Sequence, residues 1–322
     1  PRSTLFPYTT LFRSHICSLR LKPFLPEIIH KLESCNELSL PEETKRLLLG
    51  MSRSTIDRCL KRARSITAQH GISTTKPGSL LKQAIPIRTF TPWNEEQPGF
   101  LEIDLVAHCG MTTEGSYLNT LTATDIATGW TECLALPQKT QAAVSQAVVE
   151  LQKLLPFPLR GLDSDNGSEF INDTLWRYCQ TEQITFTRSR PYQKNDQAHV
   201  EQKNWSVVRH TIGYDRLDSP EELALLREIY TALRLYINFF QPVLKLVGKE
   251  RIDGKTIREY DLAQTPYRRV LADVSIPVEV KTRLVAQYVL LNPVTLRYQI
   301  DALVDRLWRI TQIGRASCRE RV

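Results

Sequence analysis

The sequence predicts a protein of the α/β class, in which a mixed β-sheet is flanked by helices. Three observations lead to this fold class. Three strand-like segments follow one another in the middle of the chain, an alternation of helices and strands comes next, and helical patterns dominate both flanking regions. A length of 322 residues is enough for two or three domains, and a hydrophobic content of 42% is ordinary for a globular chain.

Both ends of the chain are expected to be foreign to the protein. Residues 5–14 and 313–322 can be encoded by DNA strings that are reverse complements, and these strings resemble a short-read sequencing adapter. We therefore expect residues 1–14 and 312–322 to be translated adapter and exclude them from fold reasoning. They carry five arginines and one glutamate, so the net charge falls from +7 to +3 without them.

Composition excludes several classes of protein. No run approaches the ~18 apolar residues of a membrane span, and no signal-peptide pattern is present, so we expect no membrane partner. The cysteines outside the adapter ends are scattered and form no closely spaced pair. This usage fits a reducing cytosol rather than a disulfide framework.

Positive charge is concentrated near the N-terminus. Residues 45–88 hold ten lysines and arginines against a single acid, Asp57. Such a segment suits a phosphate-binding surface, although charge runs are also common on solvated helix faces.

The pattern beneath this charge predicts a helix-turn-helix domain at residues 15–72. A short helix begins at Pro41, Gly50 and Met51 form a turn, and Ser52 caps a second helix that continues to Arg64. The apolar stripe of the second helix faces inward and holds Ile56, Leu60 and Ala63. The opposite face supplies the expected DNA contacts, which are Arg53, Ser54, Arg58 and Lys61. An ordinary helical hairpin is the alternative.

Residues 99–215 predict the sheet domain. Strand patterns cover 100–108, 116–124 and 129–136, and turn-length segments separate them. The elements expected after them are helix 140–155, strand 159–163, helix 169–179, strand 185–187 and helix 196–212. Residues 73–98 are polar and proline-containing, which predicts a linker, and residues 216–311 predict a helical C-terminal region with a basic segment at 245–255.

Three acids of the sheet domain are expected at positions where burying a charged carboxylate costs free energy. Asp104 is in the middle of a strand expected to be central, and Asp165 follows the strand at 159–163, where ligands collect. Glu201 is expected on the inward stripe of the last helix, together with Trp205 and Val208. Buried carboxylates cost several kcal/mol unless they are paired or metal-bound, and oxygen ligands suit Mg²⁺ or Mn²⁺. Separate pairing of each acid with a basic residue is the alternative.

Spacing and local motifs then favour one reading of these acids. Thirty-five residues separate Asp165 from Glu201. The motifs are Asp104 in EIDLVAH, Asp165 in DSDNGSEF and Glu201 in NDQAHVEQKNW. With these residues the sequence resembles the retroviral integrase superfamily, which includes the DDE-type, integrase-core transposases of bacterial insertion sequences. The resemblance covers residues 99–213 and extends more loosely over the upstream helices and residues 223–247.

The resemblance implies a ribonuclease-H-like core that cleaves and joins DNA strands. It implies two Mg²⁺ or Mn²⁺ ions held by Asp104, Asp165 and Glu201. It selects Asp165 over Asp163, because the family's acid directly precedes Asn-Gly, and it leaves Asp163 and Asp125 as a strand and a turn residue. Asn166 and Gly167 are expected to shape the turn beside the metal. His199 and Lys203 flank Glu201 and are expected to contact DNA, with a solvated helix position as the alternative.

The resemblance also sets the expected partners. Retroviral members carry an N-terminal zinc module, but His15, Cys17, His30 and Cys35 have the wrong spacing, so the helix-turn-helix is expected in its place. The expected partners are the element's terminal repeats, target DNA and further copies of the chain, because joining two ends needs two active sites. Any helper ATPase is unknown. We expect a bacterial, cytoplasmic, nucleoid-associated transposase; the alternatives are a domesticated non-catalytic DNA-binding protein and a nuclease of the same fold.

Overall fold

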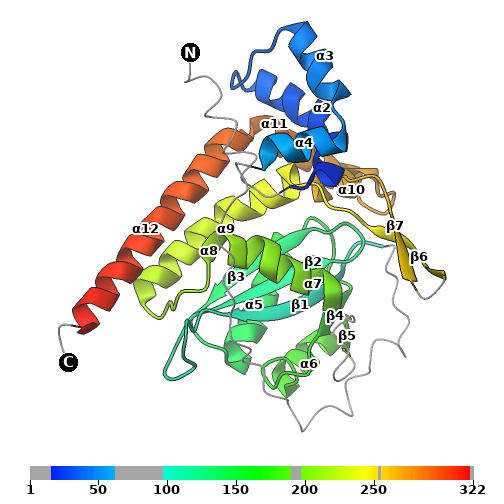
Figure 1. Cartoon of the computed structure of the whole chain (residues 1–322). Helices are drawn as coiled ribbons and strands as arrows, with labels where there is room; N and C mark the ends of the chain where they lie inside the picture. The colour runs from blue at the N-terminus through cyan, green and yellow to red at the C-terminus, as the bar shows by residue number, and fades with distance from the viewer. Residues whose placement is uncertain (1–15, 62–96, 190–196, 253–254, 320–322) are drawn as a thin grey trace. The chain divides into compact units, whose positions relative to one another are not determined.

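The computed structural model describes residues 16–61, 97–189, 197–252 and 255–319 (Figure 1). Nearly all of the linker predicted for residues 73–98 therefore lies outside the described residues. The chain divides into two compact units. The first comprises Pro1–Ala68, Leu235–Ala272 and Thr282–Gln299, and the second comprises Gln69–Arg234, Asp273–Lys281 and Ile300–Val322.

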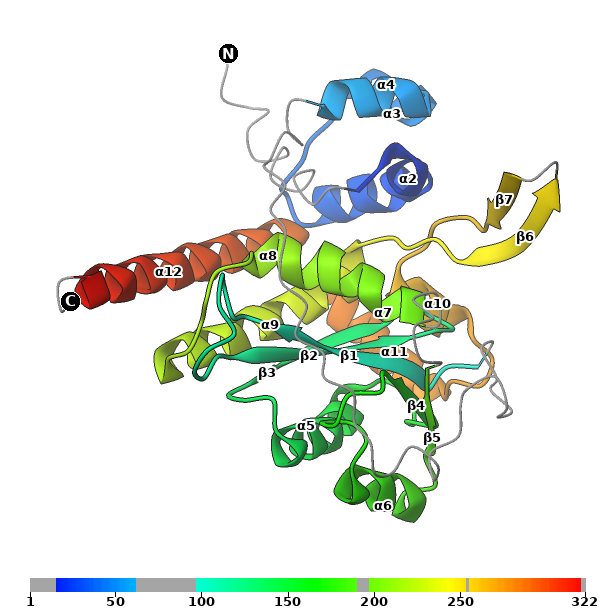
Figure 2. The same cartoon turned by 60° about the horizontal axis from the view of Figure 1, so that its bottom comes forward.

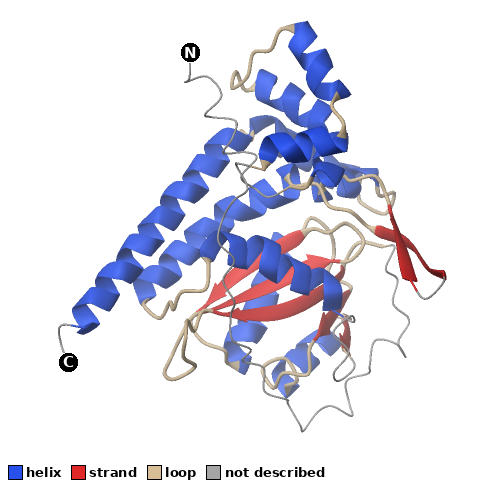
Figure 3. Cartoon of the chain, viewed as in Figure 1, coloured by secondary structure: helices blue, strands red, loops and turns tan. Residues whose placement is uncertain are grey.

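A five-stranded mixed sheet forms the centre of the second unit (Figure 3). Its strand order is β3-β2-β1-β4-β5, with β1 in the middle. The first three strands form an antiparallel meander, while β4 runs parallel to β1 and β5 runs parallel to β4. The strands are β1 (Phe100–Ala107), β2 (Asn119–Asp125), β3 (Thr131–Leu136), β4 (Gly161–Ser164) and β5 (Thr185–Arg188). The predicted ribonuclease-H-like fold class is confirmed.

Helices cover both faces of this sheet (Figure 2). On one face lie α5 (Gln141–Leu154) and α6 (Asp173–Thr181), and on the other lies α7 (Ala198–Lys203). The predicted amphipathic pattern of α5 is confirmed, because Val144, Val148 and Leu151 are fully buried. Thr140 caps its N-terminus by accepting the Ala143 N–H. The acids Glu102 and Asp104 alternate along β1 with the buried Leu101 and Ile103, so they share the opposite side of the strand.

The last helix of the sheet domain changes its hydrogen-bonding pattern along its length. The α-helix α7 passes into the π-helical segment η3 (Asn204–Arg209) and then into one turn of α-helix, α8 (His210–Ile212). Gly213 has φ +88° and ψ −157°, a conformation in which side chains are strained, and it ends the helix. The sequence predicted a helix over 196–212 but not the π-helical segment within it.

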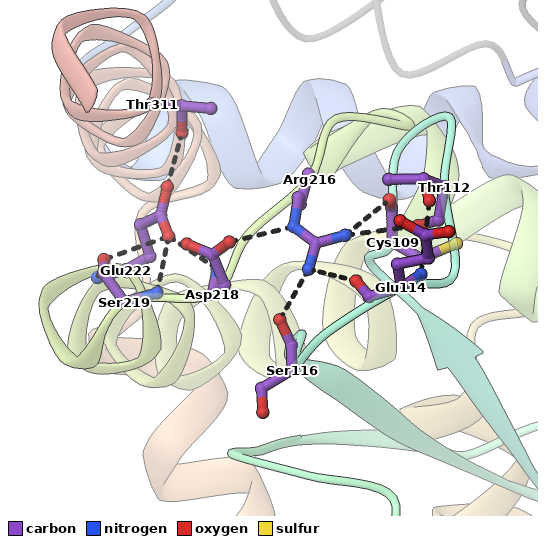
Figure 4. Close-up of polar contacts among 9 residues, drawn as sticks. All are labelled: Cys109, Thr112, Glu114, Ser116, Arg216, Asp218, Ser219, Glu222 and Thr311. Carbon is purple, nitrogen blue, oxygen red and sulfur yellow. Dashed lines mark hydrogen bonds and ion pairs between the residues drawn. The ribbon is translucent and has the colours of Figure 1, made fainter. Parts of the chain in front are cut away.

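The segment that leads into α9 (Pro220–Phe240) is held by the hydrogen bonds of Arg216 and Glu222, which Figure 4 shows. Arg216 donates hydrogen bonds to the carbonyls of Thr112, Glu114 and Ser116, which fixes the connection between β1 and β2. Glu222 accepts the N–H groups of Asp218 and Ser219 and so caps α9. It also accepts the Thr311 hydroxyl at 2.9 Å.

The first unit begins with three helices, α2 (Ser18–Ser34), α3 (Glu42–Gly50) and α4 (Arg53–Leu60). The predicted cap is confirmed, because the Ser52 hydroxyl accepts the Thr55 N–H at 3.2 Å. Ile56 is 4% exposed, as expected for the inner stripe of α4. Asp57, the lone acid of the basic segment, accepts the N–H of Ser18 and so joins α4 to the start of α2. Ala63 lies outside the described residues.

The C-terminal region is mainly helical, as expected, but it also contains one hairpin that the sequence analysis did not predict. Residues 245–255, expected only as a basic segment, contribute to an antiparallel hairpin of β6 (Leu246–Ile252) and β7 (Lys255–Tyr260). Val247, Ile252 and Ile257 are β-branched, and Asp-Gly at 253–254 of the sequence is a strong hairpin signal, so strand preference prevails over helix.

The remaining C-terminal elements are helices. They are α10 (Pro266–Ala272), α11 (Val278–Leu290) and α12 (Pro293–Arg319). A break separates α11 from α12, because Asn292 accepts the Val294 N–H and Pro293 begins α12. The helix α12 runs on through 312–319, whose adapter origin stays a prediction. No helix among the described residues is long and apolar enough to span a membrane.

Candidate active site

The sheet register brings Asp104 and Asp165 side by side. The parallel pairing of β1 with β4 ends with Ile103 opposite Ser164, so the next residues, Asp104 and Asp165, occupy neighbouring positions on adjacent strands. Adjacent strands lie about 4.8 Å apart, which places the two carboxylates at one edge of the sheet. Both residues are half-buried. Asp104 therefore lies in the central strand, as predicted, and Asp165 directly follows the end of β4, as predicted.

The electrostatics of the site extend to Glu201. Burial and the carboxylates of Asp165 and Glu201 raise the pKa of Asp104, the Leu105 N–H and Lys139 lower it, and the net value is about 7. Burial also raises the pKa of Asp165, while the Gly167 N–H opposes the shift. Asp104 thus lies within electrostatic reach of the other two predicted acids, Asp165 and Glu201.

The predicted burial of Glu201 was wrong. Glu201 is exposed and Trp205 is 58% exposed, whereas Val208 and Ile212 of the same expected stripe are buried. The buried side of α7 instead passes through Val200, and Glu201 follows it at the edge of that side. The π-helical segment, whose hydrogen bonds run from i to i+5, breaks the 3.6-residue periodicity on which the prediction depended.

Glu102 holds the helix that carries Glu201. Its carboxylate is 1% exposed and accepts the N–H groups of His199 and Val200 at 2.9 and 3.0 Å. The N-cap residue Gln197 makes no side-chain cap of its own. A carboxylate from β1 therefore supplies the acceptor, and the charge preference, that a helix N-terminus needs.

Two further groups act directly on the predicted acids. Asn204, the first residue of η3, donates from Nδ2 to Asp104 Oδ2 at 2.7 Å. Lys139 forms an ion pair with the buried Glu169 at 2.8 Å, and its charge lowers the pKa values of both Asp104 and Asp165. A buried carboxylate held by a lysine thus stands beside the triad, on the turn that follows Asp165.

The geometry of the turn after Asp165 accounts for the presence of Asn166 and Gly167 in it. A Cβ atom at Gly167 would lie 2.4 Å from Glu169 Oε1 and 2.8 Å from Asp165 Oδ1, so a side chain there would collide with both carboxylates. Asn166 donates to the Ser189 carbonyl at 2.9 Å and accepts from Arg188, which joins the end of β4 to the end of β5. These contacts support the expected role of Asn166 and Gly167 in shaping the turn.

The remaining predicted residues fall into two groups. His199 is half-buried and contributes its N–H to Glu102, whereas Lys203 is 8% exposed and lies within electrostatic range of Cys133 on β3. The expected contact of Lys203 with DNA stays a prediction, and the low exposure of this residue does not favour it. The four residues predicted to contact DNA from the second helix are all exposed: Arg53, Ser54, Arg58 and Lys61. Asp163 lies in β4, as expected, whereas Asp125, expected in a turn, is the last residue of β2 and accepts the Thr128 N–H of the turn that follows.

Comparison with known proteins identifies the family. The family model described as "Integrase core domain" matches residues 94–194. The chain belongs to the integrase core family. A relative, "Uncharacterized protein y4rM" of Sinorhizobium fredii (strain NBRC 101917 / NGR234), is 41% identical over 254 residues, which cover 79% of this chain and 73% of the relative. The crystal structure of the catalytic core domain of BIV integrase is 17% identical with a TM-score of 0.34, covering 53% of this chain and 91% of that one.

The chemistry of the three predicted acids suits a divalent cation, because carboxylates are hard oxygen ligands. Burial, followed by the neighbouring carboxylates, raises the pKa of Asp104, and a bound Mg²⁺ or Mn²⁺ would favour its ionised form. Among the described residues, no three histidine, cysteine, aspartate or glutamate side chains converge closely enough to hold one ion. Asp104 and Asp165 would form the base of the site, and the exposed Glu201 would complete it.

Sequence reasoning missed Glu102, Lys139, Glu169 and Asn204. One signal was present for Glu102, since it lies two residues before Asp104 and therefore on the same side of β1. The contacts of Lys139, Glu169 and Asn204 depend on the turn after β4 and on the π-helical segment, which local sequence patterns do not predict.

We expect Glu102→Ala to loosen the start of α7. Loss of an N-terminal acceptor costs about 0.5–2 kcal/mol, so amide exchange at His199 and Val200 should accelerate roughly 2- to 30-fold, while Glu102→Gln should retain most protection. Hydrogen exchange followed by mass spectrometry measures this effect. Glu222→Ala is the matched control, because it uncaps α9 instead. Unchanged protection at residues 199–200 in Glu102→Ala would show that this carboxylate does not hold the helix.

We expect the pH dependence of stability to report Asp104. Its pKa of about 7 in the folded chain lies above the ordinary 3.8, so the folded state binds the proton more tightly than the unfolded state. The resulting stability is fully present below about pH 4 and is lost as the pH rises through 7. In metal-free buffer, the urea midpoint of Asp104→Asn should therefore decline less over this range than that of the wild type.

Added Mg²⁺ should restore stability to the wild type at pH 7–8, because the cation favours the ionised carboxylate. Asp173→Asn, which alters an exposed carboxylate paired with Arg177, is the control and should keep the wild-type slope. Equal slopes for the wild type and Asp104→Asn would contradict the assignment of the raised pKa.

Proposed function

We propose that this integrase-core protein is a DDE-type transposase that cleaves DNA at the ends of a mobile element and joins those ends to target DNA. The observation that carries the proposal is the placement of Asp104 beside Asp165, with Glu201 close enough to raise the pKa of Asp104. Family membership agrees with a polynucleotidyl transferase.

The proposed chemistry is phosphoryl transfer at DNA. In cleavage, a water oxygen forms a bond to phosphorus and the bond from phosphorus to the 3′ oxygen breaks, which leaves a 3′-hydroxyl. In joining, that hydroxyl oxygen attacks a target phosphate, and the target strand's own 3′ oxygen leaves with a proton. Two bound Mg²⁺ or Mn²⁺ ions would supply charge neutralisation and activation of the attacking oxygen.

The protein's own residues would contribute position and charge. Asp104 and Asp165 are the rigid pair, because both are fixed at the ends of paired strand segments. Asn204 orients the Asp104 carboxylate, and the Lys139–Glu169 ion pair sets the charge beside Asp165. Glu201 is exposed on a helix held by Glu102, so it is accessible to substrate while its backbone stays fixed. Such preorganisation is the main source of catalysis in reactions of this kind.

We further propose that α3 and α4 form a helix-turn-helix that recognises the element's terminal repeats. The two helices are joined by Met51 and Ser52, and α4 exposes Arg53, Ser54 and Arg58 while burying Ile56. An exposed helix with arginine near its start suits major-groove contacts. Joining two ends calls for a dimer or larger assembly, and we place the reaction on chromosomal DNA in the bacterial cytoplasm.

We expect the full chain to reverse strand joining on a branched DNA that resembles a joined product, in the presence of Mg²⁺ or Mn²⁺. Gel analysis of labelled strands separates rejoined from hydrolysed products. Glu201→Gln should lower the rate by about 100-fold or more, since it removes a charge from the reacting centre. Glu150→Gln, which alters an exposed glutamate on α5, should retain the wild-type rate. Hydrolysis without rejoining would favour a nuclease, and DNA binding without either reaction would favour a non-catalytic binding protein.

We expect α4 to determine DNA sequence preference. Selection from a random duplex library with the wild-type chain should enrich a motif, and the double variant Arg53→Ala/Arg58→Ala should lose that enrichment. Each arginine that contacts phosphate should lower the slope of log K against log salt by about 1. Arg46→Ala on α3, whose side chain is exposed and paired with Glu43, is the control. Identical enrichment by the double variant would exclude α4 as the sequence reader.

A further inference from the structure

An exposed aromatic side chain lies immediately beside the candidate active site. Trp205 is 58% exposed, the largest exposed fraction among the tryptophans that the structure describes. Its neighbour Asn204 donates to the Asp104 carboxylate, and Glu201 precedes it by four residues on the same helix. More than half of this indole faces solvent, beside the residues that surround Asp104, and an exposed aromatic face at such a position is available to contact a substrate.

The π-helical segment accounts for the orientation of Trp205. A continuous α-helix would place Trp205 on one stripe with the buried Val208 and Ile212. The segment Asn204–Arg209 instead bonds from i to i+5. In this segment the Trp205 side chain is exposed to solvent, while the Asn204 side chain donates to Asp104. Such π-helical turns are frequent at functional sites, because they reorient side chains at a cost in helix stability.

A second ring holds the indole in place. His210 packs edge-to-face against Trp205, with ring centroids 4.3 Å apart and an interplanar angle of 79°. Partial burial lowers the pKa of the His210 imidazole. The two packed rings therefore offer a preorganised aromatic surface rather than a single mobile side chain.

We propose that Trp205, braced by His210, is a stacking platform for an unpaired nucleobase next to the reacting phosphate. Bases inside a duplex are already stacked on both faces, so an exposed indole selects a base that is unpaired or extruded. The proposed reaction supplies such bases, because a strand joined to target DNA leaves a branch point with an interrupted partner strand. This inference rests on the proposed function and names a substrate contact for the same site.

The test uses the full chain and a branched DNA in metal-free buffer, which permits binding without reaction. One branched DNA carries 2-aminopurine as the unpaired base at the branch, a second carries an abasic site there, and a fully paired duplex of equal length is the reference. Fluorescence anisotropy gives affinity, and 2-aminopurine fluorescence reports stacking.

We expect Trp205→Ala to bind the branched DNA roughly 5- to 100-fold more weakly and the paired duplex about as well as the wild type. The 2-aminopurine signal should be quenched by the wild type and by Trp205→Phe but not by Trp205→Ala. The abasic DNA should bind the wild type and Trp205→Ala equally, because the partner of the indole is gone. Trp308→Ala is the control, since Trp308 is 46% exposed in the same unit and should leave the preference unchanged.

Several results would overturn the stacking proposal. These are an equal loss of affinity for branched and paired DNA, additive effects of the abasic site and Trp205→Ala, or a change in oligomeric mass with DNA affinity intact. The last would assign Trp205 to contact with a second copy of the chain. The proposed function is tested separately by strand joining. Base-dependent binding without joining would support the stacking platform and contradict the transposase. Joining that neither Trp205→Ala nor the abasic site affects would support the transposase and contradict the stacking platform.

Discussion

The buried carboxylate of Glu102 accepts the first free N–H groups of α7, and through these two hydrogen bonds β1 positions the helix that carries Glu201. The same strand carries Asp104 two residues later, so a single backbone segment fixes two members of the predicted triad relative to each other. The third, Asp165, is fixed by strand pairing with β1. Because the N-cap Gln197 provides no acceptor, the geometry of the site depends on a tertiary contact rather than on the helix's own sequence.

The charge arrangement of the site is unfavourable without a cation. Asp104 and Asp165 lie on adjacent strands at the sheet edge, and Lys139 only partly offsets their repulsion because it is already paired with Glu169. A fold selected for stability alone would gain by replacing one carboxylate with a neutral residue. Perturbed acids in a fixed arrangement are typical of functional sites, where a bound metal or substrate supplies the missing charge.

Patterns that depend on regular periodicity predicted much of this molecule. Alternation along the chain predicted the strands of the sheet, and the Ser52 cap lies where the sequence predicted it. The hairpin at β6 and β7 was missed because charge was weighed above its β-branched residues and Asp-Gly signal. Asp104 and Asp165 were found because they lie in and after expected strands and within recognisable motifs, whereas Lys139 and Glu169 meet only through the turn after β4. Contacts of this last kind have no local pattern to reveal them.

The error over Glu201 shows where such reasoning fails at a functional site. Its predicted burial assumed 3.6 residues per turn through Trp205, but the π-helical segment changes the turn at that point. One local change of hydrogen bonding accompanies both an Asn204 side chain that orients Asp104 and an indole that faces solvent. A regular α-helix would place Trp205 on one stripe with the buried Val208 and Ile212. The irregularity therefore has a physical rationale: it lets neighbouring residues serve the reacting centre and the surface beside it.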